Sequence, residues 1–373
     1  MVLQSNEVFT LLDNKEMNFS SSHPLVRELW ALAGSSDKAR VNRIARKSRL
    51  PVRWIRSLPN GNGQCGEKKL TTDRNVLLLR NRKSPFVDQF QHPLGRCAKF
   101  YKLTSYNNCN FWCEYCFYLT FRNAPISTHF INYDKMFKEI TLFDKKNIPT
   151  YLRVLNLGEL GDPLAVDDIT DFSKEVIPFV ARETKKTKLL FLTKSDCITN
   201  LIDLEHEGRT IVSFSVNTEK VHQYLEHRTP GPLERLTAAK KVQDAGYEVR
   251  LRIDPVFEYS TWEADYRLLV DQIFSLVSPT RITIGEYRPA TGLIHHIEER
   301  FPDTRLLKIN GSLVVEAGKL RYPRKIRQKM FKTIIDSIRK HDPNTKIALC
   351  KENNSVWKSV GLNDPGLFCN CLG

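Results

Sequence analysis

Three cysteines lie within one short segment, Cys-Asn-Phe-Trp-Cys-Glu-Tyr-Cys, at positions Cys109, Cys113 and Cys116. Thiolates at this Cys-x3-Cys-x2-Cys spacing on one loop can bind three irons of a [4Fe–4S] cubane and leave the fourth iron without a protein ligand. In a reducing compartment such a group favours metal binding over disulfide bonds. The spacing therefore predicts an iron–sulfur cluster with one open coordination position.

The open iron determines which chemistry we expect. It can bind the amino and carboxylate groups of S-adenosylmethionine (SAM) and pass an electron to the sulfonium, which releases a 5′-deoxyadenosyl radical. A zinc site is the competing interpretation, but zinc usually takes four ligands, and the nearest extra candidates, His129 and Cys97, stand at irregular spacing. The many aromatic residues of the loop favour a cluster-shielding role: Phe111, Trp112, Tyr115, Phe117 and Tyr118.

The cysteines follow the first of a series of apolar, strand-like runs that alternate with amphipathic helical stretches. This alternation is typical of βα units with a parallel sheet. Six strands joined in this way predict an α/β fold, a partial (βα)6 TIM-like barrel of the radical SAM type, with ligands at the carboxyl ends of the strands. Strands are expected at 100–105, 151–157, 188–193, 210–216, 248–253 and 281–287, and helices at 133–144, 169–181, 231–245 and 262–276.

Extensions are expected on both sides of this core. Residues 1–75 form a helix-prone and then basic N-terminal extension, which ends after a turn-rich run at 59–63, and a strand is expected at 75–79. The core spans 76–290. Residues 291–373 form a C-terminal extension with a basic helix at 324–340, a short strand at 346–349 and a cysteine-bearing tail.

A second polar signal follows the second expected strand, at Gly158-Glu159. Glycine permits a close backbone approach, and a carboxylate can accept hydrogen bonds from the ammonium group of SAM. Such a dipeptide alone is more often a simple turn. Its position at a strand end favours a role in cofactor binding.

The net charge of +15 and the pI of about 9.4 predict attraction to polyanions, above all nucleic acid. Eight basic residues and no acidic ones lie between Lys38 and Arg56, and nine lie between Lys319 and Lys340 against only Asp336. Each stretch alone is more simply a solvated helix face. We expect Lys38 to Arg56, and Lys319 to Arg327 with Tyr322 among them, to face phosphates.

We expect a cytoplasmic protein with no membrane partner. No apolar run approaches the roughly 20 residues that span a bilayer, and the N-terminal residues lack the order of a secretory signal.

These residues together resemble the radical SAM superfamily and, more narrowly, the spore photoproduct lyase family of DNA-repair enzymes. The resemblance extends from about residue 75 to about 321, and besides the cysteine loop it is carried by the segments 161–167, 191–194, 214–217, 244–247 and 254–256. It implies a [4Fe–4S] cluster and SAM as cofactors and an electron donor such as flavodoxin or ferredoxin.

The resemblance also implies roles for single residues. Lys194 would meet the SAM carboxylate, Ser215 and Asn217 the methionyl or ribose groups, and Asp254 the adenosine; Tyr115 would also contact the cofactor. The alternatives are that Lys194 is simply exposed to solvent and that Ser215 and Asn217 cap the helix that follows.

The chain departs from the family at two positions. Glu159 stands where the lyases have a hydrogen-donating cysteine, and Phe117 stands where they have a tyrosine. Neither a carboxylate nor a phenyl ring donates a hydrogen atom readily to a carbon radical. Thiols of the C-terminal extension are therefore expected to supply the hydrogen atom or to bind a second metal centre: Cys350, Cys369 and Cys371. The alternative is that Cys350 is a small buried hydrophobic residue and that Cys369 and Cys371 are unstructured.

The expected function is a radical SAM enzyme that acts on DNA, RNA or a nucleotide-like substrate. Two alternatives stay open: a radical SAM enzyme that modifies a peptide or small metabolite, and a non-catalytic metal-binding protein that binds nucleic acid.

Overall fold

The computed structural model describes residues 23–35, 37–58, 64–65, 68–69, 74–90, 99–120, 126–310, 312–316, 318–363 and 370–373. Its central sheet has eight strands in the order β19-β16-β15-β13-β12-β11-β7-β6. Neighbours are parallel throughout, except for β6 and β7 at one edge. The strands are β6 (Val87–Phe90), β7 (Phe100–Leu103), β11 (Val154–Asn156), β12 (Lys188–Thr193), β13 (Thr210–Ser215), β15 (Glu248–Val256), β16 (Arg281–Glu286) and β19 (Lys346–Leu349).

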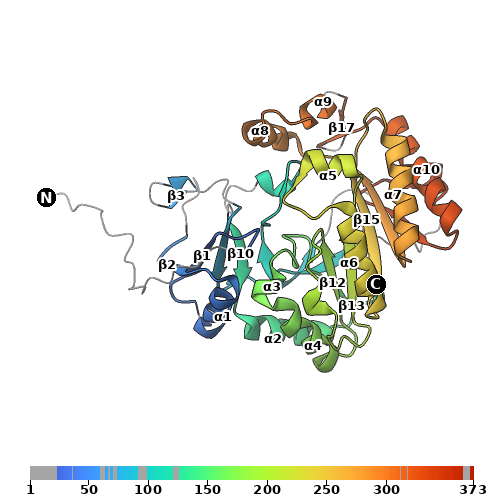
Figure 1. Ribbon diagram of the computed structural model, residues 1–373. Coiled ribbons are helices and arrows are strands. Elements are labelled where there is room, and N and C mark those ends of the chain that lie inside the picture. Colours follow the sequence, from blue (N-terminus) through green and yellow to red (C-terminus); the bar gives the residue numbers. More distant parts are fainter. Residues whose placement is uncertain are drawn as a thin grey trace.

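Helices pack on the outside of this curved sheet, as Figure 1 shows. In α2, for example, Met136, Ile140 and Phe143 are buried because their spacing of three and four residues places them on one face. The predicted partial (βα) barrel is confirmed, and each of its six expected strands is present. The covering helices are α2 (Tyr133–Asp144), α3 (Asp167–Thr170), α4 (Phe172–Glu183), α5 (Glu219–Leu225), α6 (Pro232–Asp244), α7 (Trp262–Leu276) and α10 (Arg324–His341).

A second sheet lies beside the barrel, in the order β2-β1-β5-β10-β8. Its strands are β1 (Glu28–Leu32), β2 (Val52–Ile55), β5 (Val76–Arg80), β8 (Tyr106–Asn107) and β10 (Ser127–Phe130), with α1 (Lys38–Ser48) between β1 and β2. The N-terminal segment was expected to be helix-prone, but it contributes two parallel strands to this sheet. Because β5 and β10 pair with each other and β5 also pairs with β1, the sheet crosses the boundary expected at residue 75.

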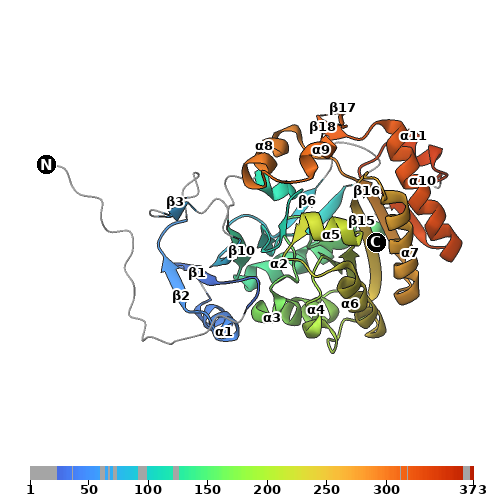
Figure 2. The same cartoon turned by 45° about the horizontal axis from the view of Figure 1, so that its top comes forward.

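The C-terminal residues pack over one end of the barrel and also join it. Figure 2 shows α8 (Thr291–Arg300), α9 (Leu306–Asn310) and the hairpin of β17 (Val314–Glu316) and β18 (Lys319–Arg321) above the strand ends. Strand β19 adds to β16 as a further parallel strand, which the isolated prediction for 346–349 did not anticipate. Helix α11 (Asn354–Ser359) follows it.

Several smaller features complete the fold. The helix expected at 169–181 is divided into α3 and α4 at Asp171, whose φ is 52°. Short strand pairs join β9 (Trp112–Cys113) to β14 (Glu226–His227) and β3 (Gln64–Cys65) to β4 (Lys68–Lys69), and single 3-10 turns occur at Phe117–Thr120, Thr150–Leu152 and Thr199–Leu201.

Within the described residues, no helix combines the length and apolar character needed to cross a membrane.

Candidate functional site

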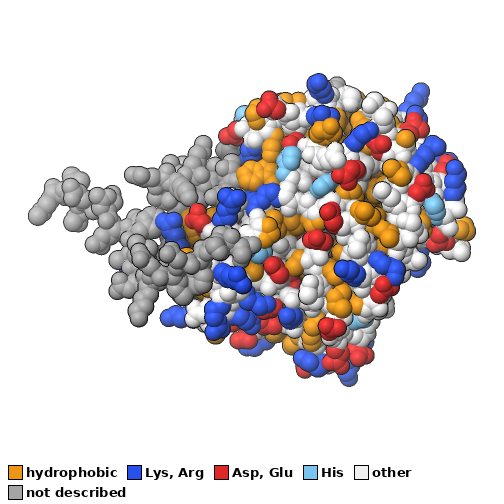
Figure 3. Space-filling model, in the orientation of Figure 1, with side chains coloured by type: hydrophobic (Ala, Val, Ile, Leu, Met, Phe, Trp, Pro, Cys, Tyr) orange, Lys and Arg blue, Asp and Glu red, His pale blue; other side chains and the backbone are white. Residues whose placement is uncertain are grey.

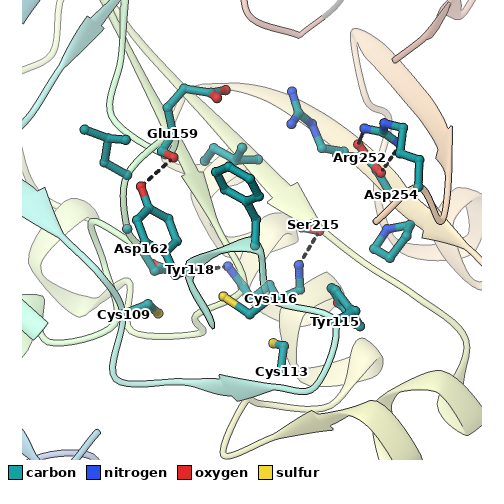
Figure 4. Close-up of a pocket in the computed structure, with 18 of the residues that line it drawn as sticks. Cys109, Cys113, Tyr115, Cys116, Tyr118, Glu159, Asp162, Ser215, Arg252 and Asp254 are labelled. Atoms are coloured by element: carbon teal, nitrogen blue, oxygen red, sulfur yellow. Dashed lines mark hydrogen bonds and ion pairs between the residues drawn. The ribbon is translucent and has the colours of Figure 1, made fainter. Parts of the chain in front are cut away.

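A cavity of about 740 Å³ opens at the carboxyl ends of the barrel strands, where the sequence places the predicted site. Figure 4 shows Cys109, Cys113 and Cys116 on one side of it, with Glu159, Ser215 and Asp254 around the rest. The structure thus brings most of the predicted site residues to one cavity. Its lining includes all three cysteines and Tyr115, Gly158, Glu159, Lys194, Ser215 and Asp254.

The cysteine loop follows β7 and is held by backbone hydrogen bonds on two sides. Asn108, with φ of 68°, donates its N–H to the carbonyl of Leu160 at 2.7 Å. Cys113 pairs with Glu226 in the short β9–β14 ladder. Cys116 N–H bonds to the Cys113 carbonyl at 3.1 Å, which turns the loop back toward the cavity.

The second sheet also holds this loop. Buried Arg74, directly before β5, donates from Nη1 to the carbonyl of Cys109 at 2.6 Å. Asn110 returns a bond from Nδ2 to the Arg74 carbonyl at 2.8 Å. The N–H of Phe111 lies 3.4 Å from Sγ of Cys109. The backbone at Cys109 is therefore held by a residue from outside the barrel.

The donor set fits an iron–sulfur cluster better than a zinc ion. Burial raises the pKa of Cys109 to about 12 and also raises the pKa of Cys113, so metal must replace protons on binding. In the described part of the chain, no three His, Cys, Asp or Glu side chains converge as ligands of one metal ion. A cubane instead binds each cysteine on a separate iron.

Behind the cysteines lies a buried network centred on Glu226. Its carboxylate accepts from Arg235 Nη2 at 2.5 Å and from the hydroxyl of Tyr115. Lys194 Nζ lies 4.0 Å from the same carboxylate and donates to Ser215 Oγ at 3.0 Å. Burial alone would raise the pKa of Glu226, but Arg235 and Lys194 lower it to about 2. The ammonium of Lys194 is thereby fixed at the cavity wall.

Two glycines allow the loops at the cavity floor to approach each other. A Cβ on Gly158 would lie 2.2 Å from Cβ of Leu192 at the end of β12. A Cβ on Gly161 would lie 2.4 Å from the carbonyl oxygen of Asn108 in the cysteine loop. Directly after Gly161, Asp162 accepts the backbone N–H of Lys194 at 2.7 Å. Both positions therefore require glycine, because any side chain there would overlap a neighbouring segment.

The far side of the cavity carries a bidentate ion pair. Arg288 donates to the two carboxylate oxygens of Asp254 at 2.9 and 3.0 Å. Burial would raise the pKa of Asp254, but Arg288 and Arg252 hold it below its usual range. Asp254 therefore reaches the cavity as a paired carboxylate.

Asn217 differs from the other predicted cofactor residues because it does not line the cavity. Its Nδ2 donates to the carbonyl of Pro255 at 2.7 Å, and its Oδ1 accepts from the hydroxyl of Tyr266 at 2.9 Å. Both polar groups of the buried amide are therefore used to join β13 to β15 and α7.

Two of the predicted C-terminal thiols lie close to cavity-lining arginines. Cys350 Sγ accepts from Arg288 Nη2 at 3.3 Å, and Cys371 Sγ accepts from Arg252 Nη2 at 3.3 Å. Both cysteines are buried. Cys369 lies outside the described residues.

Sequence reasoning missed several residues of this site. Arg252 precedes Asp254 by two positions on β15, so the alternation of side chains along a strand could have placed both on the same face. No local signal marks Arg74, Glu226 or Arg235, because their roles arise from contacts between distant segments.

The structure corrects, for several residues, the expectation that the two basic stretches face phosphates. On the face in Figure 3, Lys and Arg side chains over α1 lie beside Asp and Glu side chains. Arg40 and Arg43 bond Glu175, and Lys47 bonds Asp171. These cations are used mainly to join α1 to α4.

The C-terminal stretch is corrected in part, because Lys319 lines the cavity whereas two of its arginines and Tyr322 do not face solvent. Arg321 and Arg327 are buried against Glu286, Glu316 and Glu352. Tyr322 is fully buried and accepts the N–H of Glu258. Charge along the sequence did not reveal which cations have acidic neighbours in space.

Known proteins resemble this chain in sequence and fold. The family model described as spore photoproduct lyase matches residues 55–351. The chain belongs to the spore photoproduct lyase family. Curated spore photoproduct lyases of Geobacillus sp. (strain Y412MC61) and Bacillus subtilis (strain 168) are 27% and 26% identical to it over 237 residues, which is 61% of this chain and 69% of each relative.

Solved structures of spore photoproduct lyases share the fold. One, complexed with dinucleoside spore photoproduct, has a TM-score of 0.74 at 21% identity and is matched over 87% of this chain and 98% of its own. Another, a mutant with bound AdoMet and dinucleoside spore photoproduct, has a TM-score of 0.75 at 19% identity, over 88% and 99%. Spore photoproduct lyases are radical SAM enzymes that use a [4Fe–4S] cluster and SAM, so the predicted family, enzyme class and cofactors are confirmed.

Proposed function

We propose that this spore photoproduct lyase family member uses SAM and a cluster held by Cys109, Cys113 and Cys116 to act on nucleic acid or a nucleotide-like substrate. One observation carries the proposal: the three thiols line the same cavity as Lys194, at the carboxyl ends of parallel strands. Family membership and the dinucleoside spore photoproduct bound by similar structures support the substrate class.

The chain's own residues would then divide the work of cofactor binding. The ammonium of Lys194, which Glu226 and Ser215 orient, would bind the carboxylate of SAM. Glu159, whose backbone carbonyl accepts from the hydroxyl of Tyr118 at 3.0 Å, would accept from its ammonium group. The Asp254–Arg288 pair would face the adenosine, and Tyr115 would pack near the methionyl group. When bound, the reduced cluster with SAM supplies a 5′-deoxyadenosyl radical.

The hydrogen atom that completes such a reaction needs a donor on the chain. Glu159 lines the cavity at the position where the family has a donor cysteine, and Phe117 replaces the neighbouring tyrosine. We propose that Cys350 or Cys371 fills this role, because both thiols contact arginines of the cavity wall. An electron donor such as flavodoxin or ferredoxin is part of the same proposal.

Anaerobic reconstitution of the full chain with iron and sulfide tests the first step. We expect cluster absorbance and, after reduction with SAM, release of 5′-deoxyadenosine. Cys113→Ser should lose both. Cys197→Ser is the matched control, because Cys197 is a described free thiol outside the cysteine loop and should retain both. If the wild-type chain contains zinc and no sulfide, or if its cluster never cleaves SAM, the proposal is wrong. The alternative of a non-catalytic metal-binding protein that binds nucleic acid would then be favoured.

A second assay separates the substrate classes. Affinity for nucleic acid that falls steeply with salt supports phosphate contacts. Salt-independent affinity, or none, would favour a peptide or small metabolite instead.

A further inference from the structure

The cavity wall away from the cysteines carries cations that the cofactor proposal does not use. Arg252, Lys319 and Lys351 all line it, from β15, β18 and the residue after Cys350. Figure 4 shows the Arg252 side chain on the opposite side of the cavity from Cys109. These three residues are called the cationic wall below.

The cationic wall lacks direct carboxylate partners. No described carboxylate lies within ion-pair distance of Lys319, Lys351 or Arg252. Among the described residues, the buried Nε of Arg252 has no hydrogen-bond partner. Its Nη2 donates to the thiol of Cys371. A guanidinium held in this way retains donors for a ligand.

The acids on the same wall are already engaged. Asp254 is bound by Arg288, and Glu286 accepts from Arg321 Nε at 2.6 Å. The nearby thiol of Cys350 stays protonated, because burial raises its pKa to about 12. The charges of Lys319 and Lys351 therefore have no acidic side chain paired with them, and Arg252 shares the charge of Asp254 with Arg288.

The lysines also interact unfavourably with each other. Burial, together with the charges of Lys351 and Arg288, lowers the pKa of Lys319 to about 8. An anion that binds between like charges in a cavity relieves their repulsion and stabilises the protein. Glu159, which also lines the cavity, interacts electrostatically with Arg252, but less strongly than Asp254 does.

An exposed aromatic ring lies next to these cations. Phe117 is 51% exposed although it lines the cavity, and Lys319 Nζ lies 5.8 Å from its ring centroid. Cations that follow a backbone beside aromatic rings that stack on bases are typical of single-strand nucleic-acid sites.

We propose that Lys319, Lys351 and Arg252 bind a phosphodiester of the nucleic-acid strand that carries the reacting base, and that Phe117 stacks on an adjacent base. The inference rests on the proposed function and assigns the substrate subsite within it. The ligand chemistry is a phosphodiester with a neighbouring base, which DNA and RNA share.

Binding of a short fluorescein-labelled oligothymidylate to the anaerobically reconstituted full chain tests the subsite. Lys319→Gln and Lys351→Gln should each weaken binding roughly three- to tenfold and reduce the slope of log affinity against log salt by about one. Lys319→Arg should restore most of the affinity because it keeps the charge. Lys358→Gln, which removes an exposed cation outside the cavity, should leave affinity and slope unchanged.

A pair of dinucleotides isolates the phosphate itself. Wild-type protein should bind thymidylyl-thymidine more tightly than its uncharged methylphosphonate analogue, and the Lys319→Gln/Lys351→Gln double variant should lose this preference. Oligouridylate in place of oligothymidylate shows whether the strand is RNA or DNA. Iron content and the urea midpoint of each variant verify that it is folded and loaded.

The outcomes separate the subsite from the enzyme. A double variant that binds oligothymidylate as wild type does, or a wild type that binds both dinucleotides equally, would overturn the subsite. If binding depends on both lysines while the wild type never releases 5′-deoxyadenosine, the proposed catalysis fails and the subsite stands.

Discussion

Glu226 shows how single residues behind the cavity control the groups that face it. Its carboxylate is 1% exposed and contacts Arg235, Tyr115 and Lys194. A buried charge is tolerated only when it is paired and hydrogen-bonded. The orientation of Lys194 at the cavity wall therefore depends on a carboxylate and a guanidinium that do not reach the cavity.

Removing Arg235 should be strongly destabilising. Arg235→Met leaves the Glu226 carboxylate buried without its main partner, and we expect the free energy of unfolding to fall by about 3 kcal/mol. Urea unfolding measures this loss. Arg235→Met/Glu226→Gln should regain part of it, because the second change removes the unpaired charge. A single variant within about 0.5 kcal/mol of wild type would contradict this account.

Gly158 acts through the space that it leaves empty. In Gly158→Ala, the new methyl would overlap Cβ of Leu192, so the ends of β11 and β12 must separate. We expect a loss of roughly 1–3 kcal/mol in the free energy of unfolding. Gly292→Ala is the matched control, because nothing lies within 4 Å of its added Cβ, and in α8 alanine should be neutral or slightly stabilising. Equal stability of the two variants would count against close approach at Gly158.

Among the elements, β5 and the cysteine loop form a joint between the two sheets. Arg74 and Asn110 exchange hydrogen bonds across it, and Arg74 also bonds the carbonyl of Cys109. The N-terminal sheet is therefore part of the support for the proposed cluster. The expectation of a separate extension before residue 76 did not include this role.

Loss of Arg74 should change the properties of the bound cluster. Arg74→Gln removes a buried positive charge next to Cys109, so reduction becomes less favourable and the midpoint potential should fall by on the order of 50 mV, where 59 mV is a tenfold change for one electron. Potentiometric titration monitored by electron paramagnetic resonance measures it. Arg182→Gln, an exposed cation on α4, should not shift the potential. If the midpoint potential is unchanged in Arg74→Gln protein that contains the cluster, the charge of Arg74 does not influence the cluster.

The same elements show what the sequence could and could not predict. Strands such as β12 and helices such as α7 were predictable because their apolar periodicity is local, and the Cys-x3-Cys-x2-Cys spacing is itself local. The pairing of Arg40 with Glu175, or of Arg321 with Glu352, joins residues far apart in sequence. No periodicity encodes such pairs, so several cations expected on a phosphate-facing surface, such as Arg40 and Arg321, proved to be paired with acids.

At the scale of the whole molecule, residues 370–373 pack across the open sheet of the barrel. Asn370 bonds Ser213 and Leu251, and Arg250 donates to the carbonyls of Asn370 and Leu372. Cys371 and Leu372 pack against Phe100. This segment, whose thiol was expected to be a hydrogen donor, a metal ligand or unstructured, joins strands from both halves of the barrel.

Asn370 therefore provides a test of how the barrel is closed. Its side chain is fully buried, donates to Ser213 Oγ at 2.9 Å and to the Leu251 carbonyl at 2.8 Å, and comes from a segment that also accepts from Arg250. Asn370→Ala leaves these acceptors without a partner, and we expect the free energy of unfolding to fall by roughly 1–3 kcal/mol, measured by urea unfolding with cluster content as a second readout. Asn363→Ala, at an exposed position before the segment, should change the free energy by less than about 0.5 kcal/mol. We expect Asn370→Ala to lower the stability while the cluster content stays at the wild-type level. Loss of both together would instead link closure of the barrel to the cysteine loop.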